Sequence, residues 1–251
     1  MLNILQHYWT LYQKIKLAMS SLISDTIKSI FSTVFHLKGT NKSIISKFAE
    51  KSGLVYFGFV DQNSDEHEVV RGFSVSATHH DDSYCVGTVS GYNVTVVDRT
   101  DVAHQPNEKS STFNWLIIAI DLHTKYRIPH FFIGANNHDL KPYAALFSSF
   151  PNMIKSNLGT FELYSSEFTS RFTVYDRPAK SVEVEQILTG EVTRTIGAHF
   201  WPLSIEQHDN VLYVYSSNGN VTLGLLDTML ENGLWLAGQI DSKTENLQVR
   251  A

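Results

Sequence analysis

The first forty residues carry apolar side chains at the spacing of a helix. One stripe begins at Leu5 and advances by three or four residues at a time to Leu22, and a second stripe resumes at Ile27 after a shift of register. This near-heptad period predicts one long amphipathic helix, or two helices in series, ending at Gly39. The side chains that we expect this helix to place against a membrane or another polypeptide are Leu5, Tyr8, Trp9, Tyr12, Ile15, Met19, Leu22, Ile27, Ile30 and Val34.

Beyond a short predicted helix at 42–51, the period changes from helical to alternating. Alternation of apolar and polar residues is typical of a strand with one buried face. The segment 112–122 has a continuous apolar centre instead, which predicts a strand buried on both faces. Pro129 then favours the start of an edge strand. Alternating segments predict strands at 54–60, 69–77, 84–88 and 92–97, the last two joined by a hairpin turn at Ser90-Gly91.

The second half of the chain mixes the two periods. Strands and helices that come in runs, without strict alternation, favour an α+β fold with mostly antiparallel sheet. We therefore expect a body of roughly eight or more strands and about three packed helices, preceded by the long N-terminal amphipathic helix. The predicted elements are helices at 140–150, 178–196 and 221–236, strands at 161–164, 168–174 and 211–215, and a loop at 216–220.

Charge divides the chain at nearly the same place as the hydrophobic pattern. The chain is 43% hydrophobic and 18% charged, which is enough apolar material for a sizeable core and excludes global disorder. Residues 1–51 hold seven lysines and two acidic residues, a net charge of +5, so the total of −5 leaves −10 on the other 200 residues. We expect an N-terminal helical segment at 1–39 and a globular domain at 40–251, with a softer boundary near 156–160.

Three environments could receive the apolar stripe of residues 1–38. A transmembrane span requires about 20 mostly apolar residues, and serines, Asp25 and Lys28 interrupt the best window. A basic amphipathic helix can instead lie in an anionic membrane surface, with Tyr8 and Trp9 near the headgroups. Packing against another copy of the chain, another protein or the body satisfies the same pattern. We expect self-association or a protein partner first and an anionic membrane surface second, whereas the acidic body disfavours nucleic acid.

One dense cluster of metal-binding residue types lies in the stretch SATHHDDSYC at 76–85. Successive side chains of a strand point to opposite faces, so the two adjacent histidines cannot bind one ion, and each can be joined only by the aspartate two residues later. A catalytic zinc site needs about three protein ligands, and no third ligand has a recognised spacing. The competing interpretation is a solvated turn at 81–83 that leads into a strand, with Cys85 packed in the core. The candidate metal ligands are His79, His80, Asp81 and Asp82.

Four segments of the body carry a recognisable layout: 48–56, 86–94, 168–175 and 205–215, the last before a Leu-rich helix. In these segments the chain resembles a loose group of uncharacterised bacterial proteins. Those proteins place an N-terminal helical or membrane-associated segment before a mixed α/β domain, and the resemblance implies the same organisation here. It implies no catalytic residues.

The motif content favours an interaction or scaffold protein over an enzyme. Glycine-rich phosphate loops and nucleophile elbows are absent, and His67-Glu68 is followed by Arg71 where a zincin motif needs its second histidine. We therefore expect a non-enzymatic protein without a cofactor, tethered or oligomerised through its N-terminal helix. Its expected location is the cytoplasm or the inner face of a membrane. The alternative is a metal-dependent hydrolase that uses the cluster at 79–82.

Deletion of residues 1–38 is expected to leave a folded body. The apolar stripe of these residues is separate from the strand patterns that predict the core, so the core does not depend on it. Thermal unfolding followed by circular dichroism should show a cooperative transition for the deletion variant as for the full chain. A variant without a cooperative transition would show that the N-terminal helix is part of the core.

Overall fold

The computed structural model of the chain describes residues 41–60, 79–103, 111–136, 152–156 and 164–248. The chain divides into two compact units, 1–41 and 42–251, and the architecture below is that of the second unit. The segments 1–39, 69–77 and 140–150, for which a helix, a strand and a helix were predicted, lie outside the described residues, as do residues 161–163 of the strand predicted at 161–164.

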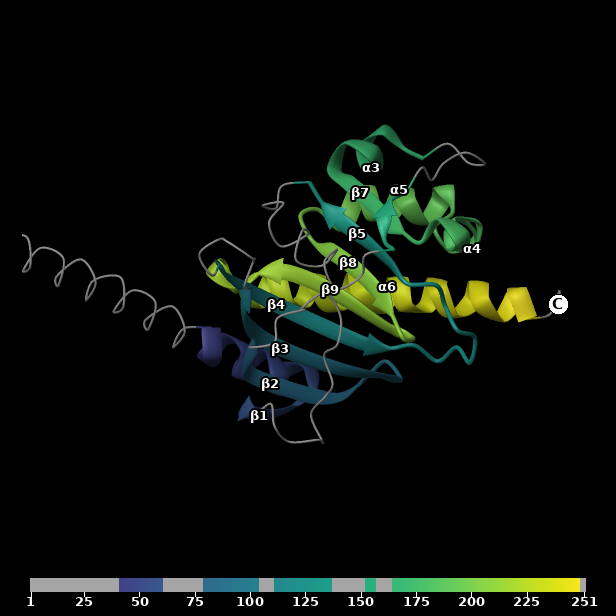
Figure 1. Cartoon of the computed structure of the whole chain (residues 1–251). Helices are drawn as coiled ribbons and strands as arrows, with labels where there is room; N and C mark the ends of the chain where they lie inside the picture. The colour runs from purple at the N-terminus through teal and green to yellow at the C-terminus, as the bar shows by residue number, and fades with distance from the viewer. Residues whose placement is uncertain (1–40, 61–78, 104–110, 137–151, 157–163, 249–251) are drawn as a thin grey trace, which may run out of the picture. The chain divides into compact units, whose positions relative to one another are not determined.

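One sheet of nine strands organises the described residues (Figure 1). The strands are β1 (Val55–Val60), β2 (His79–Val89), β3 (Tyr92–Ala103), β4 (Ser111–Asp121), β5 (Phe131–Ala135), β6 (Ile154–Lys155), β7 (Phe172–Asp176), β8 (Ser204–His208) and β9 (Val211–Ser217). Their spatial order is β1-β2-β3-β4-β9-β8-β5-β7-β6, and all neighbours run antiparallel. The predicted class, α+β with a mostly antiparallel sheet, is therefore confirmed for these residues. The predicted turn at Ser90-Gly91 joins β2 to β3.

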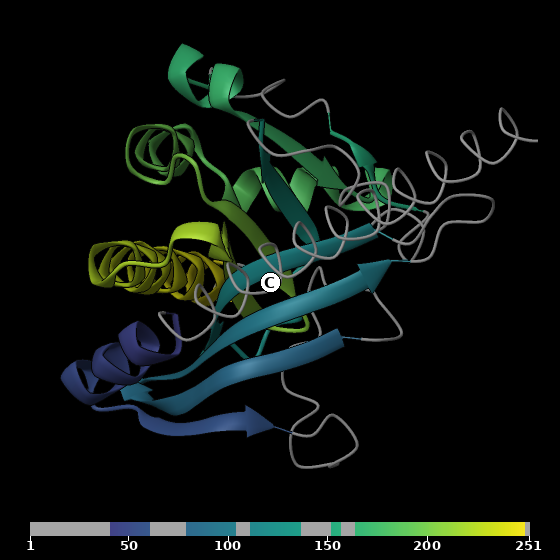
Figure 2. The same ribbon diagram turned by 90° about the vertical axis from the view of Figure 1, so that its left-hand side faces the viewer.

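Helices cover one face of this sheet (Figure 2). They are a helix over 41–52, α3 (Ser166–Arg171), α4 (Ser181–Ile187), α5 (Gly190–His199) and α6 (Leu223–Gln248), with short 3₁₀ turns η2 (Pro178–Lys180) and η3 (Asn218–Asn220). The main apolar core lies between helices and sheet, where Phe48, Ile118 and Leu226 are fully buried and Cys85 packs as expected. Burial of each such large side chain contributes about 1.5–3 kcal/mol. None of the described helices, α6 included, combines the length and hydropathy needed to cross a bilayer.

The opposite face of the sheet carries a second and more aromatic core. Trp115 and Ile117 of β4 and Tyr213 of β9 are buried there. Ile117 and Ile118 are neighbours whose side chains point to opposite faces, and both are fully buried. The centre of β4 is thus buried on both faces, as its continuous apolar run predicted.

A buried ion pair joins the outer strands β2 and β3. Arg99 is 1% exposed, and its Nε and Nη2 each donate to one carboxylate oxygen of Asp81 over 2.6 Å. The two residues are direct partners in the ladder. Removing one partner of such a pair typically costs about 3–5 kcal/mol, so the contact holds residues 81–83 in the strand. The predicted solvated turn at 81–83 is therefore wrong, and the local turn tendency survives only as a bulge with Ser83 at φ 55°.

Three further predictions differ from the structure. Pro129 does not begin an edge strand, because β5 lies between β8 and β7 and Pro129 precedes it, outside the ladder. The helix predicted at 178–196 is divided into η2, α4 and α5, since Leu188 has a ψ of 61°, which is not helical. The segment predicted as a strand at 168–174 begins within α3 and becomes extended only at Phe172.

The hairpin β8–β9 lies between two strands that are consecutive in the described sequence. β4 pairs with β9, and β5 pairs with β8, so the connection of β4 to β5 must pass over the end of the hairpin. That connection is residues 122–130. The end of the hairpin is the two-residue turn Asp209-Asn210, whose φ values of 49° and 60° are those of a turn with both central residues left-handed.

Candidate functional site

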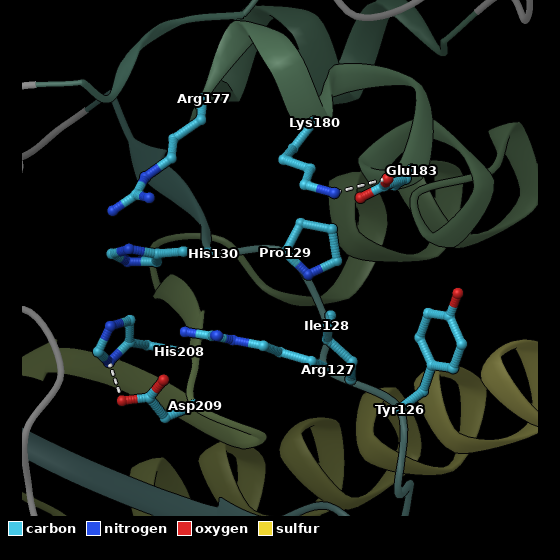
Figure 3. A pocket seen from close by; sticks show the side chains of 10 residues that line it. All are labelled: Tyr126, Arg127, Ile128, Pro129, His130, Arg177, Lys180, Glu183, His208 and Asp209. Atoms are coloured by element: carbon cyan, nitrogen blue, oxygen red, sulfur yellow. Dashed lines mark hydrogen bonds and ion pairs between the residues drawn. The ribbon is translucent and has the colours of Figure 1, made fainter.

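A pocket lies where residues 122–130 cross the hairpin turn (Figure 3). β7 ends at the same end of the sheet, because Asp176 pairs with Phe131 at the start of β5. The chain then continues into η2 beside the pocket. The pocket has a volume of about 640 Å³, within the range of roughly 300–1,000 Å³ usual for small-molecule sites. Its lining residues are Tyr126, Arg127, Ile128, Pro129, His130, Arg177, Lys180, Glu183, His208 and Asp209.

Asn210 fixes the middle of the crossing segment 122–130. Its side-chain Oδ1 accepts a hydrogen bond from the N–H of Ile128 over 3.2 Å, and its Nδ2 donates to the carbonyl of Thr124 over 3.1 Å. These contacts satisfy backbone groups that a loop near the core would otherwise leave unpaired. Residues 125–127 therefore project from a backbone that is held on both sides.

Two more side chains hold the ends of the same segment. Asp241 of α6 is 8% exposed, and its carboxylate accepts hydrogen bonds from the N–H groups of His123 over 3.2 Å and Thr124 over 3.0 Å. The fully buried Gln207 of β8 donates its side-chain amide to the carbonyl of Pro129 over 2.5 Å. The pocket wall is consequently tied to the hairpin and to α6, and side chains on such a wall keep a fixed position.

A buried carboxylate lies beneath the pocket. Glu206 of β8 is fully buried, and its Oε2 accepts a hydrogen bond from the Tyr215 hydroxyl over 2.7 Å. Its Oε1 lies 2.7 Å from Nε2 of His130, whose side chain is 7% exposed. With the proton on Nε2 the ring donates to this carboxylate, and the contact sets the orientation of the ring. His130 is therefore a fixed imidazole at the pocket wall.

His208 places a second imidazole against the first. The ring centroids of His208 and His130 are 4.4 Å apart. Burial lowers the pKa of His208 below its usual value, and the neighbouring His130 and Arg177 lower it further, against the opposing effect of Asp209 and Glu206. At neutral pH this ring is therefore uncharged, and a negative charge entering the pocket would favour its protonation.

Three permanent cations line the pocket, and two of them have no carboxylate partner among the described residues. Lys180 forms an exposed ion pair with Glu183 at 2.8 Å. Arg127 and Arg177 make no ion pair with any carboxylate among the residues that the structure describes. Both guanidinium groups extend toward the side of the pocket that holds the two imidazoles (Figure 3). This side of the pocket is therefore suited to a negatively charged group.

A smaller cavity adjoins the pocket on its apolar side. It has a volume of about 100 Å³ and extends to Ile187 and Thr244. The residues that it shares with the larger pocket are Tyr126, Ile128, Pro129 and Glu183. Tyr126 is 46% exposed, so its ring stands at the solvent edge of both cavities. The two cavities together offer a charged region and an apolar wall.

The metal ligands predicted from the sequence do not line this pocket. Both carboxylate oxygens of Asp81 accept hydrogen bonds from Arg99, which leaves them poorly placed to bind an ion. Nε2 of His80 lies 3.4 Å from Oδ1 of Asp82, and both side chains are partly exposed. His79 is the first residue of β2. Among the described residues no three His, Cys, Asp or Glu side chains are arranged to hold a metal ion. The predicted contacts of the N-terminal helix lie outside the described residues.

Sequence reasoning missed the residues of the pocket. Arg127, Arg177 and His208 lie far apart in the sequence, follow no known spacing and meet only because of the strand order. The pair Asp209-Asn210 was a local signal for a β-hairpin, because both residue types tolerate the positive φ that a two-residue hairpin turn requires. That signal locates β8 and β9 but says nothing of the segment that crosses them.

Replacement of Asn210 tests how the pocket wall is held. Asn210→Ala loses both side-chain hydrogen bonds and places alanine at a φ of 60°, so we expect a loss of roughly 2–3 kcal/mol in the free energy of unfolding. Asn210→Gly loses the same hydrogen bonds but accepts the backbone conformation, so we expect a loss of about 1–2 kcal/mol. Urea unfolding measures both values. Equal stability of Asn210→Gly and the parent chain would contradict the role of the side chain in holding residues 122–130.

Comparison with known proteins bears on the fold alone. The chain matches no protein-family model and no curated protein. Among solved structures it is similar to the crystal structure of the mycobacterial trehalose monomycolate transport factor A, TtfA, with a TM-score of 0.52 and 10% sequence identity. The match covers 81% of this chain and 93% of that chain. At this identity the likeness establishes that the two proteins share a fold.

Proposed function

We propose that the chain is a non-enzymatic accessory protein that acts by binding. In this proposal the α+β body is a binding domain, and residues 1–38 link it to a second copy of the chain. The observation that carries the proposal is the pocket of about 640 Å³ at the hairpin turn, whose wall is fixed by Asn210, Gln207 and Asp241. A fixed wall reduces the entropy lost when a ligand binds.

The shared fold supports the same interpretation. The solved structure that the chain resembles is named a transport factor, a name that is compatible with a non-enzymatic accessory role. The likeness covers 81% of this chain and 93% of that chain, so it extends over most of the body. By contrast, the hydrolase alternative draws no support from the cluster at 79–82, because Asp81 is already bound by Arg99.

The pattern of residues 1–38 supports a linking role. Its apolar stripe has the period of a helix that packs on another helix, and its lysines lie outside that stripe. An anionic membrane surface could receive the same stripe, at the inner face of a cytoplasmic membrane, and the experiment below separates these two partners.

The full chain is expected to form oligomers through the stripe. Light scattering after gel filtration should give a mass above that of one chain. The double variant Ile15→Glu/Met19→Glu should be monomeric, because it places two charges in the apolar seam. Gln13→Glu, outside the stripe, is the matched control and should leave the mass unchanged.

A monomeric full chain would point to a membrane surface, in place of a second copy, as the partner of residues 1–38. If the full chain is monomeric, self-association through residues 1–38 is excluded. Flotation with anionic vesicles that is lost at high salt and in the Ile15→Glu/Met19→Glu variant would then identify a membrane surface as the partner.

A further inference from the structure

We propose that the pocket at the hairpin turn binds a phosphate-bearing ligand, with its phosphate group between Arg127 and Arg177 and its organic part against Tyr126, Ile128 and Pro129. The inference rests on the proposed function, since it names the ligand class of the binding domain. It concerns a site that is separate from residues 1–38, so it can be tested independently of the link between copies.

The charge of the pocket differs from that of the domain around it. Residues 52–251 carry a net charge of −10, yet the pocket has three permanent cations against Glu183 and Asp209. Lys180 and Glu183 largely compensate each other. The guanidinium groups of Arg127 and Arg177 remain without a carboxylate among the described residues. Two arginines without a carboxylate partner among the described residues, at one cavity of an acidic domain, are suited to bind a negatively charged ligand.

The chemistry of these cations favours an oxyanion. A guanidinium group is planar and offers parallel N–H donors, which match the oxygen atoms of a phosphate group. Both guanidinium groups lie on the side of the pocket where His130 and His208 stand, so donors converge there from the crossing segment, from the end of β7 and from β8 (Figure 3). His130 is oriented by its contact with the buried Glu206, so the donors available to the ligand are those of the two arginines and of His208.

The size and the second wall of the pocket favour an organic part. A volume of about 640 Å³ exceeds what a bare phosphate ion would fill. The opposite side offers the exposed ring of Tyr126 and the apolar surfaces of Ile128 and Pro129, and beyond them the smaller cavity extends to Ile187. A ring or short aliphatic group attached to the phosphate would cover this wall and bury apolar surface.

Calorimetric titration of the full chain with phenyl phosphate tests the proposal directly. We expect phenyl phosphate to bind, inorganic phosphate to bind more weakly, and phenol to show no measurable binding. Absence of phenyl phosphate binding would overturn the proposal. Equal affinity for phenyl phosphate and inorganic phosphate would overturn the assignment of Tyr126, Ile128 and Pro129 to the organic part.

Variants locate the binding. Arg127→Gln and Arg177→Gln should each weaken phenyl phosphate binding roughly tenfold, because each removes one charged hydrogen-bonding group. Both side chains are exposed, so the variants should fold, and circular dichroism checks this. Arg194→Gln, an exposed arginine of α5 that does not line the pocket, is the matched control and should bind as the parent chain does. Full affinity in the double variant Arg127→Gln/Arg177→Gln would overturn the proposal.

The pH dependence gives a second, independent test. Phenyl sulfate is the probe, because its charge is constant from about pH 8 to about pH 6, where histidine titrates. The charged and titratable groups around His208 are His130, Arg127, Arg177, Asp209 and Glu206. Burial and the positive neighbours lower the pKa of His208, and the negative charge of a bound anion raises it again. Binding is therefore coupled to uptake of a proton by His208. We expect the affinity to increase severalfold as the pH falls. His208→Gln should abolish this dependence, and a pH-independent affinity in the parent chain would contradict the role of His208.

A competition experiment distinguishes two sources of the phosphate group. Phosphatidylcholine vesicles with phosphatidic acid should displace phenyl phosphate if the natural ligand is a lipid headgroup, whereas glycerol phosphate alone should displace it if the ligand is a soluble ester. Vesicles without phosphatidic acid are the control. If neither competitor displaces phenyl phosphate, the proposal is overturned. If the parent chain forms oligomers but does not bind phenyl phosphate, this inference is refuted and the linking role of residues 1–38 stays in place.

Discussion

The position of the hairpin β8–β9 between β4 and β5 is the constraint from which the pocket follows. Hydrogen bonding of β9 to β4 and of β8 to β5 forces residues 122–130 to pass over the hairpin turn. A segment in that position needs partners for its backbone, and Asn210 and Asp241 supply them. A pocket whose wall is held by such hydrogen bonds is formed before a ligand binds.

Most of the buried polar side chains among the described residues lie on strands of the sheet, and several of them are paired with one another. Glu206 is shared between Tyr215 and His130, and Arg99 binds Asp81 through two hydrogen bonds. A different case is Asp176 at the end of β7, which is fully buried and whose pKa is raised by that burial. Its ionised form is therefore disfavoured in the folded state, and the stability contributed by this residue decreases as the pH rises above the usual carboxyl range.

The hydrophobic pattern correctly predicted those elements whose structure depends on the order of apolar and polar residues within one segment. The apolar run of β4, the turn at Ser90-Gly91 and the class of the fold could be read from periodicity, because each depends on local residue order. Residues 81–83 could not, since their strand depends on Arg99, a partner on another strand. Strand β8 was missed because it carries Glu206 and Gln207, polar residues buried by specific hydrogen bonds. The pocket could not be predicted at all, because strand order is a property of long-range pairing.

The contact between Asp241 and the N–H of His123 joins residues that are 118 positions apart. A chain emerging from the ribosome can pair β2 with β3 early, but it cannot fix the start of residues 122–130 through Asp241 until α6 has been made. Contacts of such long range form late, because the entropy of closing the intervening loop opposes them. During synthesis the wall of the pocket is thus completed only after α6 has been made. A chain that ends before α6 would keep its lining residues and lose the carboxylate that holds the start of their segment in place.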